Sequence, residues 1–138
     1  MIFYADDDAE DLDLFTEIAQ DLNQELMTFK SGTALLEKLD SPPPSPTIIF
    51  LDINMPGYTG LDILKIIRSK EHWRKMPVVM FSTSTSDSNI EASLELGATY
   101  YLPKNPDFTE LVKEIKFVLN KEWDNFNPRQ DGFVYGQS

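Results

Sequence analysis

The stretch IIFLDINMPGYTG, residues 48–60, decides the fold. It opens with four consecutive apolar residues, Ile48–Leu51, and passes directly into Asp52. A strand that is apolar at every position is buried on both faces, which is typical of a parallel sheet covered by helices. The Met-Pro-Gly run that follows is typical of a turn. The stretch therefore predicts a central strand with a carboxylate at its carboxyl end.

Similar apolar runs recur along the chain and alternate with amphipathic stretches. We expect further strands at Ile2–Ala5, Val78–Phe81 and Tyr100–Leu102, and a weaker one at Leu26–Phe29. Between the strands, apolar residues at helical spacing are Leu12, Phe15, Ala19 and Leu22, then Leu61, Leu64 and Ile67, and then Leu111, Ile115, Val118 and Leu119. Five strand–helix units predict an α/β fold, a doubly wound parallel sheet with helices on both faces.

Polar residues mark the starts of two further helices. Ser31 precedes a short helix over Ala34–Leu39. Ser88 with Glu91 fits a capping box, in which the two side chains satisfy the first backbone N–H groups of a helix. Gly97 is expected to end that helix.

Two segments stand outside this alternation. The run SPPPSP, residues 41–46, is typical of a stiff surface connection. Residues 123–138 lose periodicity, so we expect one domain over residues 1–122 followed by a C-terminal tail over residues 123–138. Large aromatic residues in the tail would pack on the domain or on a partner: Trp123, Phe126, Phe133 and Tyr135.

Composition restricts the classes of function. The chain has 138 residues, 41% of them apolar, which is enough for one domain with a full core. A net charge of -11 argues against a nucleic-acid partner and fits a protein that binds cations or basic partners. The absence of cysteine excludes disulfides and thiolate sites, and His72 alone makes histidine-based catalysis a poor hypothesis. No apolar run is as long as a membrane span and no secretory signal is visible, so we expect a cytoplasmic protein.

Reactive side chains follow the expected strands at their carboxyl ends, where parallel α/β sheets bind ligands. They are Asp6, Asp7 and Asp8 after the first strand, Asp52 after the third, Ser82 after the fourth and Lys104 after the fifth. Two or three carboxylates at one edge suit Mg²⁺. Asp52 could then attack a phosphoryl group and form an aspartyl phosphate. Lys104 would neutralise the transferring oxygens, and Ser82 would donate a hydrogen bond to the product.

Each of these residues also has an ordinary structural interpretation. The acidic run Asp6–Asp8 could begin a helix, and Asp52 could start a turn. Lys104 could be a surface lysine, and Ser82 could end a strand. Their joint placement at successive strand ends favours one common site. Within the acidic run, we interpret Asp8 as a helix-start acid rather than a metal ligand.

The same residues resemble the receiver domain of two-component response regulators, from Ile2 to about Glu122. The resemblance is strongest to stand-alone, chemotaxis-type regulators. The residues that match the family's motifs are Asp6 and Asp7 for the acidic pair, Asp52, Met55, Pro56 and Gly60 for the D-x-x-M-P-x-x-x-G pattern, Ser82 for the Ser/Thr, Tyr101 for the switch aromatic and Lys104 for the lysine. One departure is Asn105, which stands where the family usually has proline after the lysine.

The resemblance implies a flavodoxin-like fold with strand order 2-1-3-4-5. It also implies a Mg²⁺ site formed by Asp6, Asp7, Asp52 and the backbone carbonyl of Asn54. Asp52 would take a phosphoryl group from a phosphohistidine on a sensor histidine kinase or a histidine phosphotransfer protein. The domain would then catalyse only its own phosphorylation and its slow dephosphorylation, and would not otherwise be an enzyme.

The resemblance further implies a conformational switch. Ser82 would move toward the phosphoryl group and Tyr101 would turn inward, which changes the surface for a downstream effector protein. We expect no DNA-binding domain to follow, so output is expected by protein–protein contact, with no nucleic acid and no membrane involved. The sequence does not fix the oligomeric state, and a homodimer is one of the states that the family allows.

Two other functions compete with this one. A haloacid-dehalogenase-like phosphatase uses a D-x-D-x-[TV] motif; Asp6 and Asp8 fit it, but Glu10 replaces the Thr or Val and Asn54 replaces a further acid. A pseudo-receiver is a binding module of the same fold that is never phosphorylated. The complete set of acids, hydroxyl and lysine argues against the pseudo-receiver, while Asn105 leaves it open.

Overall fold

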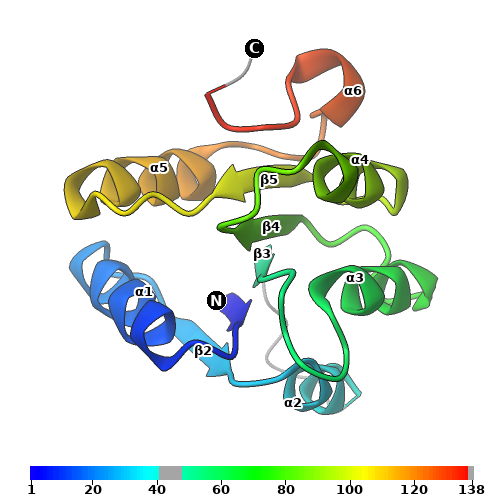
Figure 1. The fold of residues 1–138 in the computed structure, drawn as a ribbon, viewed down its shortest axis with the longest axis horizontal. Coiled ribbons are helices and arrows are strands. Elements are labelled where there is room, and N and C mark those ends of the chain that lie inside the picture. The colour runs from blue at the N-terminus through cyan, green and yellow to red at the C-terminus, as the bar shows by residue number, and fades with distance from the viewer. Residues whose placement is uncertain (41–47, 137–138) are drawn as a thin grey trace.

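In the part of the chain that it describes, residues 1–40 and 48–136, the computed structural model contains a five-stranded parallel sheet (Figure 1). The strands are β1 (Ile2–Ala5), β2 (Leu26–Phe29), β3 (Ile48–Leu51), β4 (Val78–Ser82) and β5 (Tyr100–Pro103). Their order, β2-β1-β3-β4-β5, confirms the predicted doubly wound, flavodoxin-like fold. The strands β4 and β5 each run one residue further than predicted. The predicted connection over residues 41–46 lies outside the described residues.

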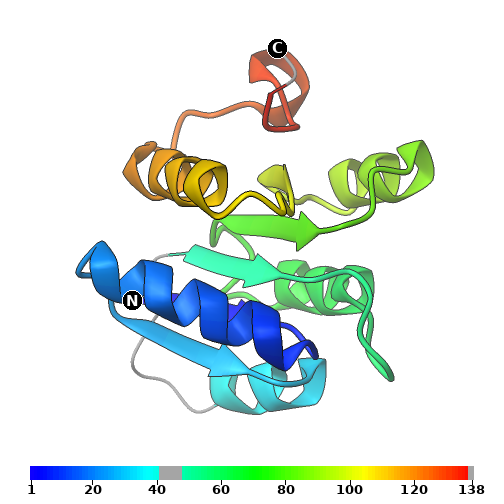
Figure 2. The same cartoon turned by 60° about the vertical axis from the view of Figure 1, so that its left-hand side comes forward.

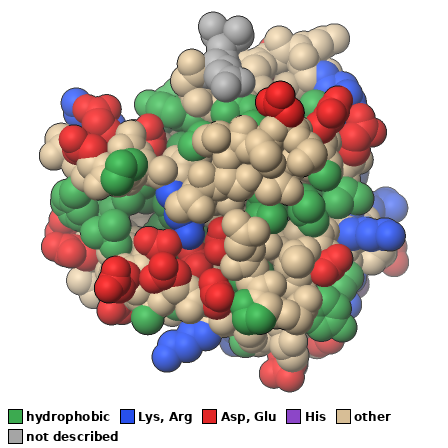
Figure 3. Space-filling view, in the orientation of Figure 1, with side chains coloured by type: hydrophobic (Ala, Val, Ile, Leu, Met, Phe, Trp, Pro, Cys, Tyr) green, Lys and Arg blue, Asp and Glu red, His purple; other side chains and the backbone are tan. Residues whose placement is uncertain are grey.

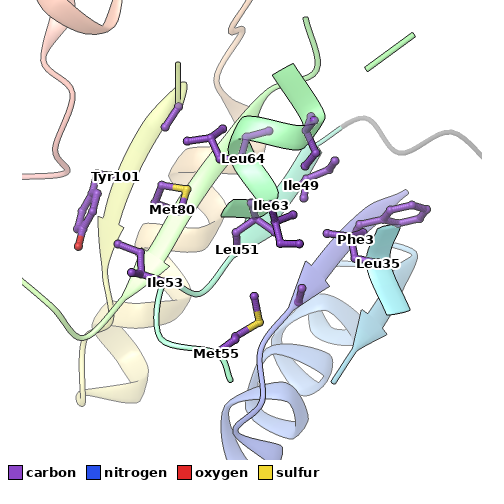
Figure 4. Close-up of a cluster of buried hydrophobic side chains, with 14 of the residues drawn as sticks. Phe3, Leu35, Ile49, Leu51, Ile53, Met55, Ile63, Leu64, Met80 and Tyr101 are labelled. Atoms are coloured by element: carbon purple, nitrogen blue, oxygen red, sulfur yellow. The ribbon is translucent and has the colours of Figure 1, made fainter. Parts of the chain in front are cut away.

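Helices cover both faces of the sheet (Figure 2). They are α1 (Ala9–Asp21), α2 (Gly32–Leu39), α3 (Gly60–Ser69), α4 (Asp87–Glu95), α5 (Phe108–Asn120) and the short α6 (Pro128–Asp131). The apolar faces of α1 and α5 pack on one side of the sheet, and those of α2, α3 and α4 on the other. The second of these two clusters is drawn in Figure 4, where Ile63 and Leu64 of α3 meet Leu51 of β3. Strands buried on both faces are thus explained by their apolar runs.

The register of β1 with β3 decides where the acidic residues lie. Ala5 pairs with Leu51, the last residues of these two neighbouring strands. The next residues along the chain, Asp6 and Asp52, therefore leave the sheet side by side. The predicted carboxylate edge follows directly from the lengths of these apolar runs.

Two helix starts test the capping predictions. Ser31 caps α2 as expected, by accepting a hydrogen bond from the backbone N–H of Ala34. The capping box predicted for Ser88 and Glu91 is wrong, because α4 begins at Asp87 and its N-cap is Ser86. A serine two residues earlier accepts from the helix's free N–H groups, so the helix starts there. Gly97 follows the end of α4 with φ +94°, which confirms the predicted stop.

The tail, which is described over residues 123–136, lies against the domain beyond β5 (Figures 1 and 2). Trp123 packs on Tyr100 with ring centroids 5.0 Å apart, and Phe133 and Val134 are buried. The tail's aromatic residues were expected to pack on the domain or on a partner protein. In the structure these residues pack on the domain.

Candidate functional site

Three carboxylates meet at the carboxyl edge of the sheet. Ligand oxygens of Asp6, Asp7 and Asp52 all lie within 4.8 Å of one another. Asp6 is fully buried and Asp52 is 5% exposed, whereas Asp7 is exposed to solvent. Backbone hydrogen bonds hold the two buried residues, since the N–H of Asp52 donates to the carbonyl of Ala5 at 3.0 Å. Figure 3 shows acidic side chains gathered on this side of the molecule, over α1 and next to a basic side chain.

Asp6 is held by three donors. Its Oδ1 accepts from the backbone N–H of Asp8 at 2.9 Å, and its Oδ2 accepts from the Tyr4 hydroxyl and from Lys104 Nζ. Burial, and then the charge on Asp6, raises the pKa of Tyr4, so its hydroxyl keeps its proton and stays a donor. Sequence reasoning did not find Tyr4. The sequence does contain a signal for it: Tyr4 lies two residues before Asp6, and residues i and i+2 of a strand point to the same face.

Lys104 joins the acids together. Its Nζ lies 2.7 Å from Asp6 Oδ2, 2.8 Å from Asp11 Oδ2 and 3.7 Å from Asp52 Oδ1. Burial disfavours the charged form of Lys104, but the hydrogen bonds that its ammonium donates to Asp11 and Asp6, with the negative charge of the acids, outweigh burial and raise its pKa. Asp11 was not among the predicted site residues. Asp11 lies in the first turn of α1, three residues after the acidic run. This closeness to the predicted site could have made it a candidate.

Burial raises the pKa of Asp52 to about 7; the charge on Lys104 opposes this shift and that on Asp6 adds to it. A backbone hydrogen bond from Asn54 favours the charged form. The edge thus contains more negative charge than one lysine neutralises. Hard divalent cations such as Mg²⁺ take carboxylate oxygens as ligands, so the donor set of Asp6, Asp7 and Asp52 fits such an ion. The Asn54 carbonyl as a further ligand stays a prediction.

Asp8 has a structural role, as expected. It is the N-cap of α1, and its side chain accepts from the backbone N–H groups of Glu10 and Asp11. The acidic run therefore divides between two neighbouring ligand candidates and one helix cap.

Ser82 and Tyr101 lie in a hydrogen-bond network next to the acids. The buried Ser82 accepts through Oγ from the Ser84 N–H at 3.1 Å, and its carbonyl accepts from the Lys104 N–H at 2.8 Å. The Tyr101 hydroxyl donates to the Ser84 carbonyl at 2.7 Å, and Tyr101 is fully buried. The structure thus brings Asp6 and Asp52 into direct contact with Lys104, with Asp7 beside the two acids. Hydrogen bonds link Lys104 through Ser82 and Ser84 to Tyr101.

Gly60 permits the close packing beneath Asp52. A Cβ atom at this position would lie 2.2 Å from the Asp52 carbonyl oxygen and 2.9 Å from Ile53 Cα, so no other residue fits without moving the backbone. The N–H of Gly60 donates to the Ile53 carbonyl at 2.9 Å. The glycine of the D-x-x-M-P-x-x-x-G pattern therefore has a steric role next to the Asp52 backbone.

Asn105, the residue that departs from the expected proline, begins the connection to α5. Its Oδ1 accepts from the Asp107 N–H at 2.9 Å, and its Nδ2 lies 3.4 Å from Glu114 Oε1. The other Glu114 oxygen is buried without a hydrogen-bond partner. Burial raises the pKa of Glu114. Asn105 thus shapes the loop that carries Lys104 through side-chain hydrogen bonds.

Sequence comparisons agree with this geometry. The family model described as response regulator receiver domain matches residues 2–116. The transcriptional regulatory protein CpxR of Escherichia coli is 31% identical over 131 residues, which are 94% of this chain; the chain spans 54% of the length of CpxR. The response regulator Rcp1 of Synechocystis sp. is 28% identical over 125 residues, covering 86% of this chain and 85% of Rcp1.

Solved structures with the same fold include a Mn²⁺-bound receiver and a phosphorylated receiver. The Mn²⁺-bound form of Rcp1 has a TM-score of 0.78 at 26% identity, covering 91% of this chain and 96% of Rcp1. The phosphorylated cyanobacterial phytochrome response regulator RcpA has a TM-score of 0.78 at 27% identity, covering 85% and 89% of the two chains. The chemotaxis protein CheY4 of Vibrio cholerae has a TM-score of 0.75 at 26% identity, covering 85% and 96%. This chain belongs to the response regulator receiver domain family of two-component signal transduction.

Proposed function

We propose that Asp52 accepts a phosphoryl group from the phosphohistidine of a sensor histidine kinase or histidine phosphotransfer protein. The observation that carries this proposal is the buried Asp52 carboxylate, which lies 3.7 Å from Lys104 Nζ and is grouped with Asp6 and Asp7. That arrangement supplies a nucleophile, a cation and a set of metal ligands at one point. Related receivers have been solved in a Mn²⁺-bound form and in a phosphorylated form, which supports it.

The transfer forms a bond between an Asp52 carboxylate oxygen and phosphorus, and it breaks the phosphorus–nitrogen bond of the donor histidine. Asp6, Asp7, Asp52 and the carbonyl of Asn54 would hold Mg²⁺. That ion would neutralise charge on the phosphoryl oxygens when it is bound. Lys104 donates from Nζ to a transferred oxygen, and the Ser82 hydroxyl donates to another. Slow attack of water on the same phosphorus atom returns Asp52 to its carboxylate.

The output is a change of surface that follows from phosphorylation. Ser82 and Tyr101 report the acceptor's state to the region of α4, β5 and α5, where an effector protein or a second copy of the chain binds. A basic partner surface suits the acidic charge of the chain. We place this exchange in the cytoplasm; among the residues described, no helix is long and apolar enough to cross a membrane.

Incubation of the protein with phosphoramidate and Mg²⁺ tests the proposal. We expect the mass of one phosphoryl group to be added, the modification to be lost on chelation of the metal, and the label to map to Asp52. A pseudo-receiver would stay unlabelled while still binding its partner. Labelling at any other residue would contradict the proposal.

Asp11→Asn should speed phosphorylation, because Asp11 and the incoming phosphoryl group compete for Lys104 Nζ. The Asp11 side chain is 31% exposed, so its ion pair stabilises the resting arrangement by only about 1 kcal/mol. Release of that interaction predicts roughly fivefold faster labelling by phosphoramidate. Stopped-flow fluorescence or timed mass spectrometry measures the rate.

The matched control for this prediction is Asp13→Asn. Asp13 is an exposed acid of the same helix, and the substitution changes the net charge equally. If both variants accelerate labelling to the same extent, the effect is general electrostatics and the role given to Asp11 is wrong.

A further inference from the structure

The tail occupies the outer edge of the sheet at β5, which is the last strand in the sheet order. The N–H of Tyr101 donates to the Phe133 carbonyl at 2.9 Å, and the N–H of Tyr135 donates to the Tyr101 carbonyl at 3.0 Å. Val134 thereby forms a parallel bridge with Tyr101. An open strand edge carries unpaired backbone groups that attract other chains, and the tail satisfies those of Tyr101.

Side chains of the tail pack on both sides of this edge. Phe133 lies beside the Tyr101 ring with centroids 6.2 Å apart, and Phe133 and Val134 are 8% and 7% exposed. Tyr135 packs edge-on against Phe117 of α5 at 5.4 Å. On the α4 side, a recess of residues from both segments is lined by Ile90, Leu94, Pro128, Arg129, Gly132, Phe133 and Val134. The tail therefore spans the surface from α4 to α5, with Tyr101 at its centre.

Tyr101 is also the residue that reaches toward the acids. Its hydroxyl donates to the Ser84 carbonyl, and the Ser84 N–H donates to Ser82 Oγ. Ser82 in turn accepts from the Lys104 N–H. The tail holds Tyr101 by its backbone and its ring, while the loop after β4 holds it by its hydroxyl. If the Tyr101 ring were to leave its buried place, it would lose the Ser84 bond and its packing with Phe133 together.

We propose that Phe133–Tyr135 is a docking segment whose binding to the β5 edge and the phosphorylation of Asp52 favour each other through Tyr101. The inference rests on the proposed function. A phosphoryl group on Asp52 that accepts from the Ser82 hydroxyl orders the loop over residues 82–84. An ordered Ser84 carbonyl is a better acceptor for Tyr101, and a fixed Tyr101 is a better platform for Phe133. Because coupling between two sites is reciprocal, a docked tail must strengthen phosphoryl binding by the same factor.

Hydrogen exchange at two amides reports tail docking directly in the full chain. The probes are the N–H groups of Tyr101 and Tyr135, which form the backbone hydrogen bonds between β5 and the tail. Beryllofluoride with Mg²⁺ serves as the phosphoryl mimic. We expect it to slow exchange at both amides by about fivefold, at the low end of typical coupling. The N–H of Ile2, which bonds to the Glu25 carbonyl at the far side of the sheet, is the internal control and should not respond.

Phe133→Ala tests the reverse direction. It should lower the affinity for beryllofluoride by about the same factor of five, as measured by titration of the fluorine signal. Phe126→Ala is the matched control, because Phe126 packs on Tyr100 and Trp123. Equal loss of affinity in both variants would mean that general destabilisation, and not the Tyr101 contact, is responsible.

Tyr101→Phe separates coupling from docking. The ring and the backbone bonds stay, so the tail should remain protected, but beryllofluoride should no longer slow its exchange. If beryllofluoride binds the unsubstituted protein and the two amides do not respond, the coupling is refuted while the proposed function stands. If beryllofluoride does not bind at all, both fail. Protection that rises with protein concentration, together with a dimer in sedimentation, would assign the docked segment to a second copy and overturn docking within one chain.

Discussion

We expect Asp52→Asn to abolish incorporation of phosphate from phosphoramidate in the presence of Mg²⁺. The amide of asparagine is no nucleophile toward phosphorus, and it also removes one of three carboxylates from the cation site. Asp52 Oδ1 lies 3.7 Å from Lys104 Nζ, so the substitution also removes the carboxylate from its ion pair with this lysine. Intact-protein mass spectrometry measures the result. Full labelling of the variant would show that the acceptor lies elsewhere.

Loss of labelling must be distinguished from loss of the fold, and the pH dependence of stability does this. Because burial raises the pKa of Asp52 from 3.8 to about 7, the folded state binds a proton that the unfolded state releases. The Asp52 carboxyl therefore lowers the free energy of unfolding progressively as pH rises from about 4 through 7, which makes the folded protein less stable. In metal-free buffer, Asp52→Asn should be at least as stable as the unsubstituted protein, and its advantage should grow over that interval. A variant that melts earlier at pH 7 would contradict this.

Much of the fold could be predicted because its strands are continuous apolar runs. Ile48–Leu51 and Ile2–Ala5 are buried at every position. Their apolar sequence pattern therefore correctly predicted a parallel sheet with helices on both of its faces. Once two such strands pair in register, Asp6 and Asp52 must emerge together. The edge of the sheet, with its acids, hydroxyl and lysine, thus follows from local patterns and one topological rule.

The missed features depend on contacts between distant segments. Asp11 forms an ion pair with Lys104 although the two residues are 93 positions apart in the sequence. Several acids lie near the start of the same helix, and the sequence does not show which of them pairs with the lysine. Ser86 rather than Ser88 caps α4 because several serines in one loop are equivalent by type and only the geometry selects one. The tail has no period of its own, so its pairing with Tyr101 could not be inferred from sequence pattern alone.

Asp7→Ala should weaken Mg²⁺ binding by at least about tenfold, because the number of charged oxygen ligands sets the affinity of such sites over several orders of magnitude. Asp7 is exposed and has no structural hydrogen bond to lose among those described for the site, so the fold should survive its removal. Titration calorimetry in the absence of any phosphodonor measures the affinity independently of phosphorylation.

The neighbouring acid is the matched control. Asp8→Ala removes an equal charge one residue away, but Asp8 caps α1 and is not among the clustered ligand candidates. It should cost about 1 kcal/mol of unfolding free energy and leave Mg²⁺ affinity nearly unchanged. If Asp7→Ala binds Mg²⁺ as tightly as the unsubstituted protein, the ion lies elsewhere. If the two variants weaken binding equally, Asp7 acts through general charge and not as a ligand. The opposite responses of two adjacent aspartates would show that this acidic run combines a metal ligand with a helix cap.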